Sequence, residues 1–331
     1  MNKLLKLTAA LILISVTIAF LPACSNSSDR FAPTKTDKQT VMTVGGREVE
    51  YQEFRYYFLN NKRERFGAGA ELTQEQTDEL LRLTEENAKN RHGLLLLAER
   101  YGTGVTEADT AEADTYVERY RTEFFSSDED YLLALADNYM TDDLFRSLQS
   151  ENLLPYSVLA KMKETGDIDL SDEAVDAAFR SDSILCLKEI YVSKSAFESS
   201  EEARNRAEEA HANLMVGAAF EDMMLKYSSY DRASLPPEHG YYTMKYDALD
   251  VIWDTAAELA EGEYSYVIES EYGFHIVMKA PKDFGYMESI RDSIVENYSY
   301  AKFGEIFYPF IETLDIVYTD FGSSIDLATL E

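Results

Sequence analysis

The chain has 331 residues, an apolar fraction of 45% and a formal net charge of −30. This length allows more than one globular unit, and the apolar fraction excludes wholesale disorder. Phosphates would repel so acidic a chain, so nucleic acid is not expected as a partner. Only two cysteines occur, Cys24 and Cys186, which excludes a disulfide framework. The histidines lack the spacing of metal ligands, so neither a metal nor another cofactor is expected.

The first residues are typical of an export signal. Two lysines precede a mainly apolar run over residues 9–20, and Leu21-Pro22-Ala23-Cys24-Ser25 follows. This ending resembles a bacterial lipobox, in which the cysteine is lipidated and becomes the first mature residue. The alternative is a membrane-spanning helix, but the run is shorter than the roughly 20 residues that a span requires. We expect a lipoprotein signal peptide over residues 1–23 and a lipid anchor at Cys24. The protein would then lie on the extracytoplasmic face of the cell membrane.

The residues after Cys24 change from a linker to regular structure. Residues 24–40 are rich in Ser, Asp, Lys and Thr without periodic apolar positions, which predicts a flexible tether. Two β-type runs over residues 41–49 flank Gly45 and Gly46, which favour a tight hairpin because glycine accepts positive φ. Amphipathic helices are expected up to residue 182, including one that begins at a capping box at Thr73. Pro155 should bend or break the helix that starts near Thr141.

Residues 183–282 contain strand and helix signals in a distinctive order. A β-rich run over 184–192 opens the stretch, and a second run over 272–278 closes it. Between them come a charged helix, a short helix ending at Tyr227 and Ser228, a Pro/Gly loop and another helical turn. This order resembles the parvulin-type (PpiC, or rotamase) peptidyl-prolyl isomerases along the whole stretch. The resemblance implies a small antiparallel sheet surrounded by helices.

Residues 283–331 hold one more amphipathic helix, which Pro309 is expected to end, and a strand over 314–318. A lone helix and strand cannot bury their own apolar faces, so this tail should return to the N-terminal domain over 41–182. A mainly helical N-terminal domain completed by the C-terminal helix, with an inserted parvulin-like domain, is similar to the SurA and PrsA foldase–chaperones. The predicted fold class is α+β.

The parvulin resemblance also assigns roles to individual residues. In that family two histidines on adjacent strands meet beneath a pocket for the proline ring. His275 matches the second histidine, whereas Glu189 stands where the first is expected. In the family a Cys or Asp completes this network. The local alignment places Tyr230 at that position, and Asp231 would take its place if the loop shifts by one residue.

The proline pocket would be formed by residues among Tyr242, Met244, Ile252 and Trp253. Glu189 and His275 should lie on neighbouring strands within hydrogen-bonding distance. Such a pair is interpreted either as part of a catalytic network or as a structural contact that holds two strands in register.

Three functions remain open at this point. The first is a membrane-anchored foldase that binds unfolded or partly folded secreted polypeptides and isomerises their prolyl bonds. The second is a holdase whose parvulin-like domain binds polypeptide without catalysis. The third is an unrelated lipoprotein such as a solute receptor, for which no two-lobed α/β pattern is visible.

Overall fold

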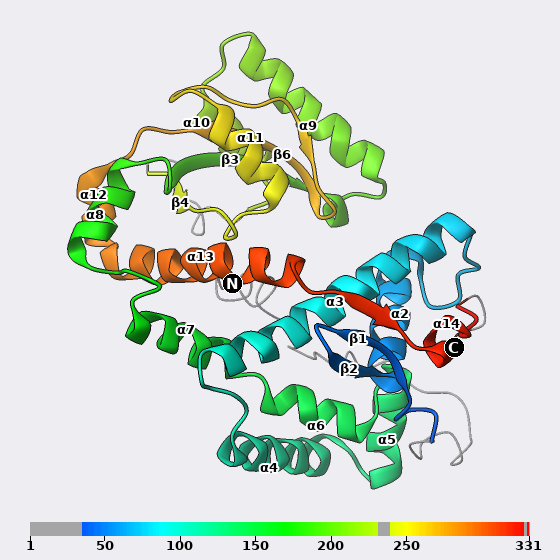
Figure 1. The fold of residues 1–331 in the computed structure, drawn as a ribbon. Coiled ribbons are helices and arrows are strands. Elements are labelled where there is room, and N and C mark those ends of the chain that lie inside the picture. The colour runs from blue at the N-terminus through cyan, green and yellow to red at the C-terminus, as the bar shows by residue number, and fades with distance from the viewer. Residues whose placement is uncertain (1–34, 231–238, 328–329, 331) are drawn as a thin grey trace. The chain divides into compact units, whose positions relative to one another are not determined.

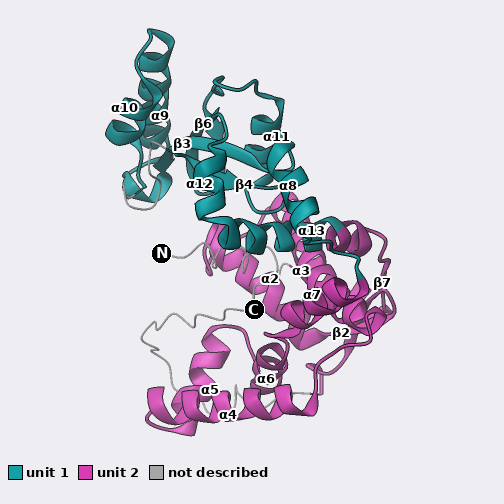
Figure 2. Ribbon diagram, turned by 90° about the vertical axis from the view of Figure 1, so that its left-hand side faces the viewer, with its two compact units in different colours: residues 1–10, 166–305 teal, residues 11–165, 306–331 magenta. Residues whose placement is uncertain are grey.

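The structure is a computed structural model that describes residues 35–230, 239–327 and 330 (Figure 1). The predicted signal peptide, Cys24, the first part of the tether and Asp231 lie outside the described residues. Two compact units are present (Figure 2). Of the described residues, unit 1 holds those of Gly166–Glu305, and unit 2 holds those of Leu11–Thr165 and Ile306–Glu331. No helix among the described residues combines the length and the apolar character that a membrane crossing requires.

Unit 2 contains a three-stranded antiparallel sheet in the order β2-β1-β7. Strands β1 (Thr40–Val44) and β2 (Arg47–Glu50) form the predicted hairpin. Its turn residues Gly45 and Gly46 have φ of 56° and 86°, the backbone that favours glycine. Strand β7 (Ile316–Tyr318) pairs with the other side of β1. The C-terminal tail therefore completes the N-terminal domain, and the predicted α+β class is confirmed.

Several helices of unit 2 begin at side-chain caps. Thr73 and Gln76 form the expected capping box at the start of α3, with hydrogen bonds of 2.9 and 3.3 Å. Pro155 is the second residue of α7, a position that proline tolerates because its missing N–H has no helical partner there. These helices are α2 (Tyr51–Phe66), α3 (Gln74–Arg100), α4 (Glu107–Phe124), α5 (Asp128–Asp137), α6 (Asp142–Ser150), α7 (Leu154–Thr165) and α14 (Asp320–Ser323).

Unit 1 is built around a four-stranded antiparallel sheet in the order β4-β3-β6-β5. Its strands are β3 (Leu185–Ser193), β4 (Tyr241–Thr243), β5 (Ile268–Glu269) and β6 (Gly273–Lys279). Helices α9 and α10 pack on one face, where Ile190 and Ile276 belong to their core cluster. Helix α11 packs on the other face, where Leu187 and Val277 contact Ile252 and Ala256.

The helices that surround this sheet include α13, which begins in unit 1 and ends in unit 2. They are α8 (Asp172–Arg180), the short η2 (Lys194–Ala196), α9 (Ser200–Met215), α10 (Phe220–Tyr227), α11 (Asp250–Glu258), α12 (Phe284–Ser289) and α13 (Arg291–Glu312). The expectation that Pro309 ends the last helix is wrong, because α13 continues to Glu312. Phe307 and Ile311 are buried on either side of Pro309. Their burial offsets the backbone hydrogen bond that proline cannot donate.

Candidate active site

Glu189 and His275 lie side by side on the two central strands of unit 1. The register pairs Tyr191 with His275 and Glu189 with Val277, so these side chains share the face that α11 covers. Glu189 Oε1 is 2.6 Å from His275 Nδ1. Both residues are buried, with exposed fractions of 3% and 2%. The hydrogen bond expected from the sequence is therefore present.

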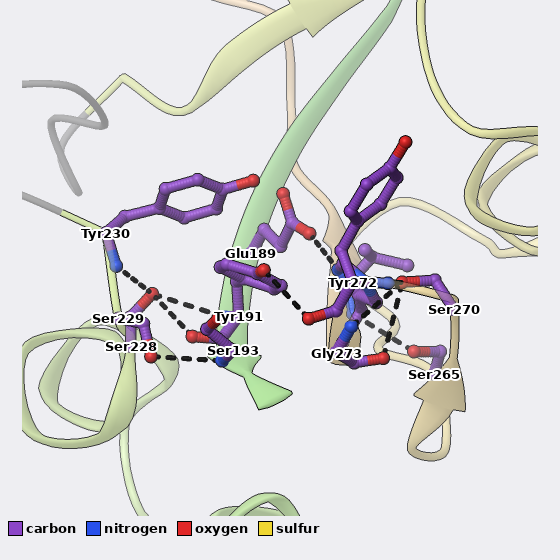
Figure 3. A network of polar contacts seen from close by, with 12 residues as sticks. Glu189, Tyr191, Ser193, Ser228, Ser229, Tyr230, Ser265, Ser270, Tyr272 and Gly273 are labelled. Carbon is purple, nitrogen blue, oxygen red and sulfur yellow. Dashed lines mark hydrogen bonds and ion pairs between the residues drawn. The ribbon is translucent and has the colours of Figure 1, made fainter. Parts of the chain in front are cut away.

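The contacts of Ser270 fix the tautomer of His275. Ser270 Oγ accepts the backbone N–H groups of Tyr272 and Gly273, each at 3.2 Å (Figure 3). Its own hydroxyl lies 2.7 Å from His275 Nε2, closer than the alternative acceptor Gly273 O at 3.3 Å. Because two donors already occupy Oγ, Ser270 donates to Nε2, and Nδ1 carries the ring proton toward Glu189. His275 is thus held between the Ser270 hydroxyl and the Glu189 carboxylate.

Glu189 accepts a second hydrogen bond from the other side of the site. The Tyr241 hydroxyl donates to Glu189 Oε2 at 3.0 Å. Burial raises the pKa of Tyr241 well above its usual value of 10, and the negative charge of Glu189 raises it further. Tyr241 therefore remains a protonated donor at any physiological pH, and the Glu189 carboxylate has a partner on each oxygen.

Tyr191 connects three parts of the site. Its ring stacks on the His275 ring with centroids 4.9 Å apart. Its hydroxyl donates to Tyr272 O at 3.1 Å, and its backbone N–H donates to Ser228 Oγ at 3.2 Å. Ser229 N in turn donates to Tyr191 O at 2.6 Å (Figure 3). The loop after α10, strand β3 and the β5–β6 turn are thereby held around His275.

Tyr230 is one of the two candidates for the place where the parvulin resemblance implies Cys or Asp. Its ring lies 4.8 Å from the Tyr191 ring, and its hydroxyl points toward the Glu189 carboxylate (Figure 3). Burial raises the pKa of Tyr230, and the charge of Glu189 adds to this effect. Asp231, the other candidate for this place, lies outside the described residues.

The four expected pocket residues separate into two groups. Ile252 on α11 packs against the sheet face that carries Glu189 and His275, and Trp253 packs against both this cluster and that of Tyr242 and Met244. Tyr242 and Met244 instead lie in a core cluster with residues of α8 and α13, and the Tyr242 hydroxyl donates to Asp283 O at 3.2 Å. The reason is strand alternation: β4 pairs Tyr241 with Leu187, so Tyr241 and not Tyr242 faces α11.

Sequence reasoning missed Ser270, Tyr241 and the central place of Tyr191. Tyr191 could have been found, because it is two residues from Glu189 and strand alternation places it on the same face. Ser270 is five residues before His275, and only a tight turn between β5 and β6 brings it back to the ring. Among the described residues, no group of three or more His, Cys, Asp or Glu side chains is arranged to hold a metal ion.

Comparison with known proteins identifies the region that contains this site. Residues 187–280 match the rotamase family model, described as a PPIC-type PPIase domain. No curated protein matches the sequence. A solved structure of PrsA from Bacillus subtilis is 19% identical, with 84% of this chain and 94% of that chain covered and a TM-score of 0.27.

Two further solved structures are similar to this chain. For foldase protein PrsA from Streptococcus pneumoniae, identity is 17%, coverage is 74% of this chain and 87% of that chain, and the TM-score is 0.35. The second is one of two structurally related SurA-like chaperones of Campylobacter jejuni. Its identity is 12%, coverage is 85% of this chain and 99% of that chain, and the TM-score is 0.29. The family match shows that the chain carries a parvulin-type peptidyl-prolyl isomerase domain over residues 187–280.

Proposed function

We propose that this protein assists the folding of secreted polypeptides by isomerising their X–prolyl bonds in unit 1. The observation that supports the proposal most directly is the buried Glu189–His275 hydrogen bond, which lies inside the region that matches the PPIC-type model. Rotation about an X–prolyl bond faces a barrier of roughly 20 kcal/mol and breaks no covalent bond. A catalyst therefore needs only to bind the twisted amide more tightly than the planar one.

The described residues supply the two elements that this reaction needs. Trp253, which is only partly buried beside the buried Ile252, offers apolar surface for a proline ring. Twisting the amide makes the prolyl nitrogen a hydrogen-bond acceptor, and the hydroxyl of Tyr230, which points toward Glu189 (Figure 3), is a donor on the same side of the sheet. In this proposal Glu189 and His275 hold these groups in place rather than form a bond with the substrate.

A protease-coupled assay with a short prolyl peptide tests the proposal. The chain should accelerate cis-to-trans conversion above the uncatalysed rate, and His275→Ala should lower kcat/KM about tenfold, the effect of losing roughly 1.4 kcal/mol of transition-state stabilisation. Wild-type conversion at the uncatalysed rate would disprove the proposed activity. Full activity in His275→Ala would disprove the role assigned to the network.

One observation favours a second candidate, a holdase without catalysis. Both ring nitrogens of His275 are hydrogen-bonded, its face is covered by Tyr191, and only 2% of the residue is exposed. His275 therefore has no exposed donor to offer a substrate. Suppressed aggregation of an unfolded protein, together with prolyl isomerisation at the uncatalysed rate, would identify a holdase.

We also propose that the protein is an extracytoplasmic lipoprotein held at the cell membrane through Cys24. Support comes from the lysines, the apolar run and the lipobox-like ending before Cys24 in the sequence. In a bacterial host, wild-type protein should fractionate with membranes, and Cys24→Ser should move it to the soluble fraction. Mass spectrometry that finds an unmodified Cys24 would refute the anchor.

A further inference from the structure

The three most exposed large apolar side chains of the described residues lie together in unit 1. Val216 is 85% exposed, Tyr266 81% and Met215 66%, whereas the next value, at Val317, is 59%. Met215 and Val216 stand at the C-terminal end of α9, and Tyr266 precedes β5. Exposed apolar side chains that cluster mark interaction surfaces more often than isolated ones do.

Two partly buried rings join these side chains into one surface. The Tyr264 hydroxyl donates to Met215 Sδ at 4.0 Å, and the Tyr264 ring lies 6.1 Å from the His211 ring. The His211 ring is in turn 5.5 Å from the Tyr266 ring. We call His211, Met215, Val216, Tyr264 and Tyr266 the α9 patch. Tyr264 also packs on the core cluster under α10, so the patch rests on well-packed structure.

The α9 patch is separate from the Glu189–His275 site. Helix α9 packs through Ala210 and Leu214 against Ile190 and Ile276. Ile190 and Ile276 are the strand neighbours of Glu189 and His275, so they point to the opposite face of the sheet. The patch therefore belongs to the α9 face, and the proposed isomerase site belongs to the α11 face.

The surroundings of the α9 patch are negatively charged. The last turn of α9 holds no basic residue, so its carbonyl end keeps its partial negative charge. Glu201 and Glu208 are exposed on α9, and their seven-residue spacings place them on the same side of the helix as Met215. Three basic side chains on the same face have acidic partners, in Arg204–Glu269, Arg206–Glu209 and Lys188–Glu221, whereas Lys226 contacts the Tyr227 hydroxyl. Cationic groups of a partner would thus find uncompensated carboxylates beside an apolar surface.

We propose that the α9 patch binds an unfolded client segment in which apolar side chains alternate with Lys or Arg. The proposal rests on the proposed function, because the client is the polypeptide whose prolyl bonds unit 1 would isomerise. Methionine and tyrosine adapt to apolar side chains of varied shape, and the neighbouring carboxylates select for positive charge. A client held on the α9 face raises the local concentration of its own prolyl bonds at the α11 face.

Fluorescence anisotropy with two labelled peptides tests this assignment on the full chain. Both peptides lack proline and share the same Leu and Phe residues, but one carries Lys and the other Glu at the intervening positions. The Lys peptide should bind about tenfold more tightly at low ionic strength. The triple variant Met215→Ser, Val216→Ser, Tyr266→Ser should weaken its binding about tenfold.

A matched control in the same unit is Phe284→Ser, since Phe284 is 54% exposed and outside the patch. This control should bind the Lys peptide like the wild type. Equal affinity for the two peptides, or unchanged binding by the triple variant, would overturn the proposal. A dimeric wild type and a monomeric triple variant in sedimentation experiments would also overturn the proposal, because a second copy of the chain would then cover the patch.

The prolyl-peptide assay on the wild type separates this proposal from the proposed function. Uncatalysed conversion with patch-dependent binding of the Lys peptide would refute the isomerase and support the α9 patch. Catalysed conversion without patch-dependent binding would refute the α9 patch and support the isomerase.

Discussion

Glu189 stands where the parvulin resemblance implies a histidine, and a carboxylate differs chemically from an imidazole at that position. A second imidazole could exchange roles with His275 as donor and acceptor, whereas a carboxylate only accepts. Glu189 accordingly accepts from His275 and Tyr241, and Ser270 donates to the other nitrogen of His275. At the scale of single residues, this substitution converts a pair that can share a proton into a chain with a fixed direction of hydrogen bonding.

Replacing Glu189 with glutamine tests how much this arrangement of hydrogen bonds contributes to the stability of the protein. The amide can accept from His275 with its oxygen and donate from its NH2 group to the Tyr241 oxygen, but the Tyr241 proton then loses the acceptor that Glu189 provides. We expect Glu189→Gln to lose about 1–3 kcal/mol in unfolding free energy, the cost of an unsatisfied buried group. Urea unfolding measures this loss. Adding Tyr241→Phe to Glu189→Gln should restore part of it, and no restoration in the double variant would contradict the assigned contact.

A second buried carboxylate, Glu53 in unit 2, makes stability depend on pH. It contacts Arg91 at 2.6 Å and His92 at 3.1 Å, and its side chain is 4% exposed. Burial alone would raise the pKa of Glu53, but the charge of Arg91 and the hydrogen bond with His92 outweigh burial and lower it from 4.5 to about 2. Because the folded pKa is depressed, the stabilisation is complete above pH 4.5 and disappears as the pH falls toward about 2.

Glu53→Gln should therefore destabilise the protein by about 3 kcal/mol at pH 7, since it leaves Arg91 buried with a weakened partner. The difference from the wild type should shrink when unfolding is measured between pH 4.5 and about 2. Glu86→Gln is a suitable control, because Glu86 is 57% exposed and pairs with the exposed Arg82. It should cost less than about 1 kcal/mol. A pH-independent difference for Glu53→Gln would contradict this account.

At the scale of elements, the loop between β4 and α11 depends on a glycine in α13. Tyr246 has φ of 68°, a backbone that a bulky residue adopts only when its contacts hold it there. A Cβ on Gly304 would come within 2.9 Å of Tyr246 Cγ and Cδ2. The ring of Tyr246 thus lies against the bare backbone of α13.

Gly304→Ala should destabilise unit 1, although alanine normally stabilises a helix by about 1 kcal/mol relative to glycine. We expect a net loss of about 1–3 kcal/mol from overpacking, measured by urea unfolding. Removing the whole side chain in Tyr246→Gly should remove the clash, because Tyr246 Cβ also lies 3.0 Å from the added Cβ, so that adding Gly304→Ala to this variant is neutral or stabilising. If Gly304→Ala alone raised the unfolding free energy, the Tyr246 side chain would be able to move aside without destabilising the protein, which would contradict this prediction.

The sequence predicts an element well when the residues that determine it are close together in the chain. The hairpin at Gly45 and the start of α3 at Thr73 were predictable, because turn and cap chemistry act within a few residues. The pairing of Tyr241 with Leu187 and the continuation of α13 past Pro309 were not. Both depend on contacts with segments distant in sequence, which a local pattern does not contain.

The same distinction holds for the candidate site. Glu189 and His275 could be paired in advance, because both lie on strands that the parvulin resemblance makes neighbours. Ser270 could not, since its contact with His275 depends on the exact turn between β5 and β6. The catalytic role of this network stays a prediction until the isomerase is assayed.

At the scale of the whole molecule, the two ends of unit 2 depend on each other. Deleting residues 314–331 removes β7 and α14 and leaves one side of β1 unpaired. We expect unit 2 to lose its cooperative unfolding transition and the protein to aggregate, because an unpaired strand edge recruits other chains. Calorimetry and light scattering measure these effects. Val317→Ser is the control, as Val317 is 59% exposed and its backbone pairing is kept. A truncated protein that stays monomeric with two transitions would contradict the expectation.

The central position of β1 also affects the order in which the two sheets can form when the chain is made or exported from its N-terminus. Strand β1 is among the first described segments to emerge, yet its partner β7 is among the last. The residues of unit 1 from Gly166 to Glu305 form one uninterrupted segment and are all available before β7 appears. Unit 1 can therefore complete its sheet while one edge of β1 in unit 2 is still unpaired. Because loop closure between β1 and β7 spans nearly the entire chain, we expect unit 2 to limit the overall folding rate.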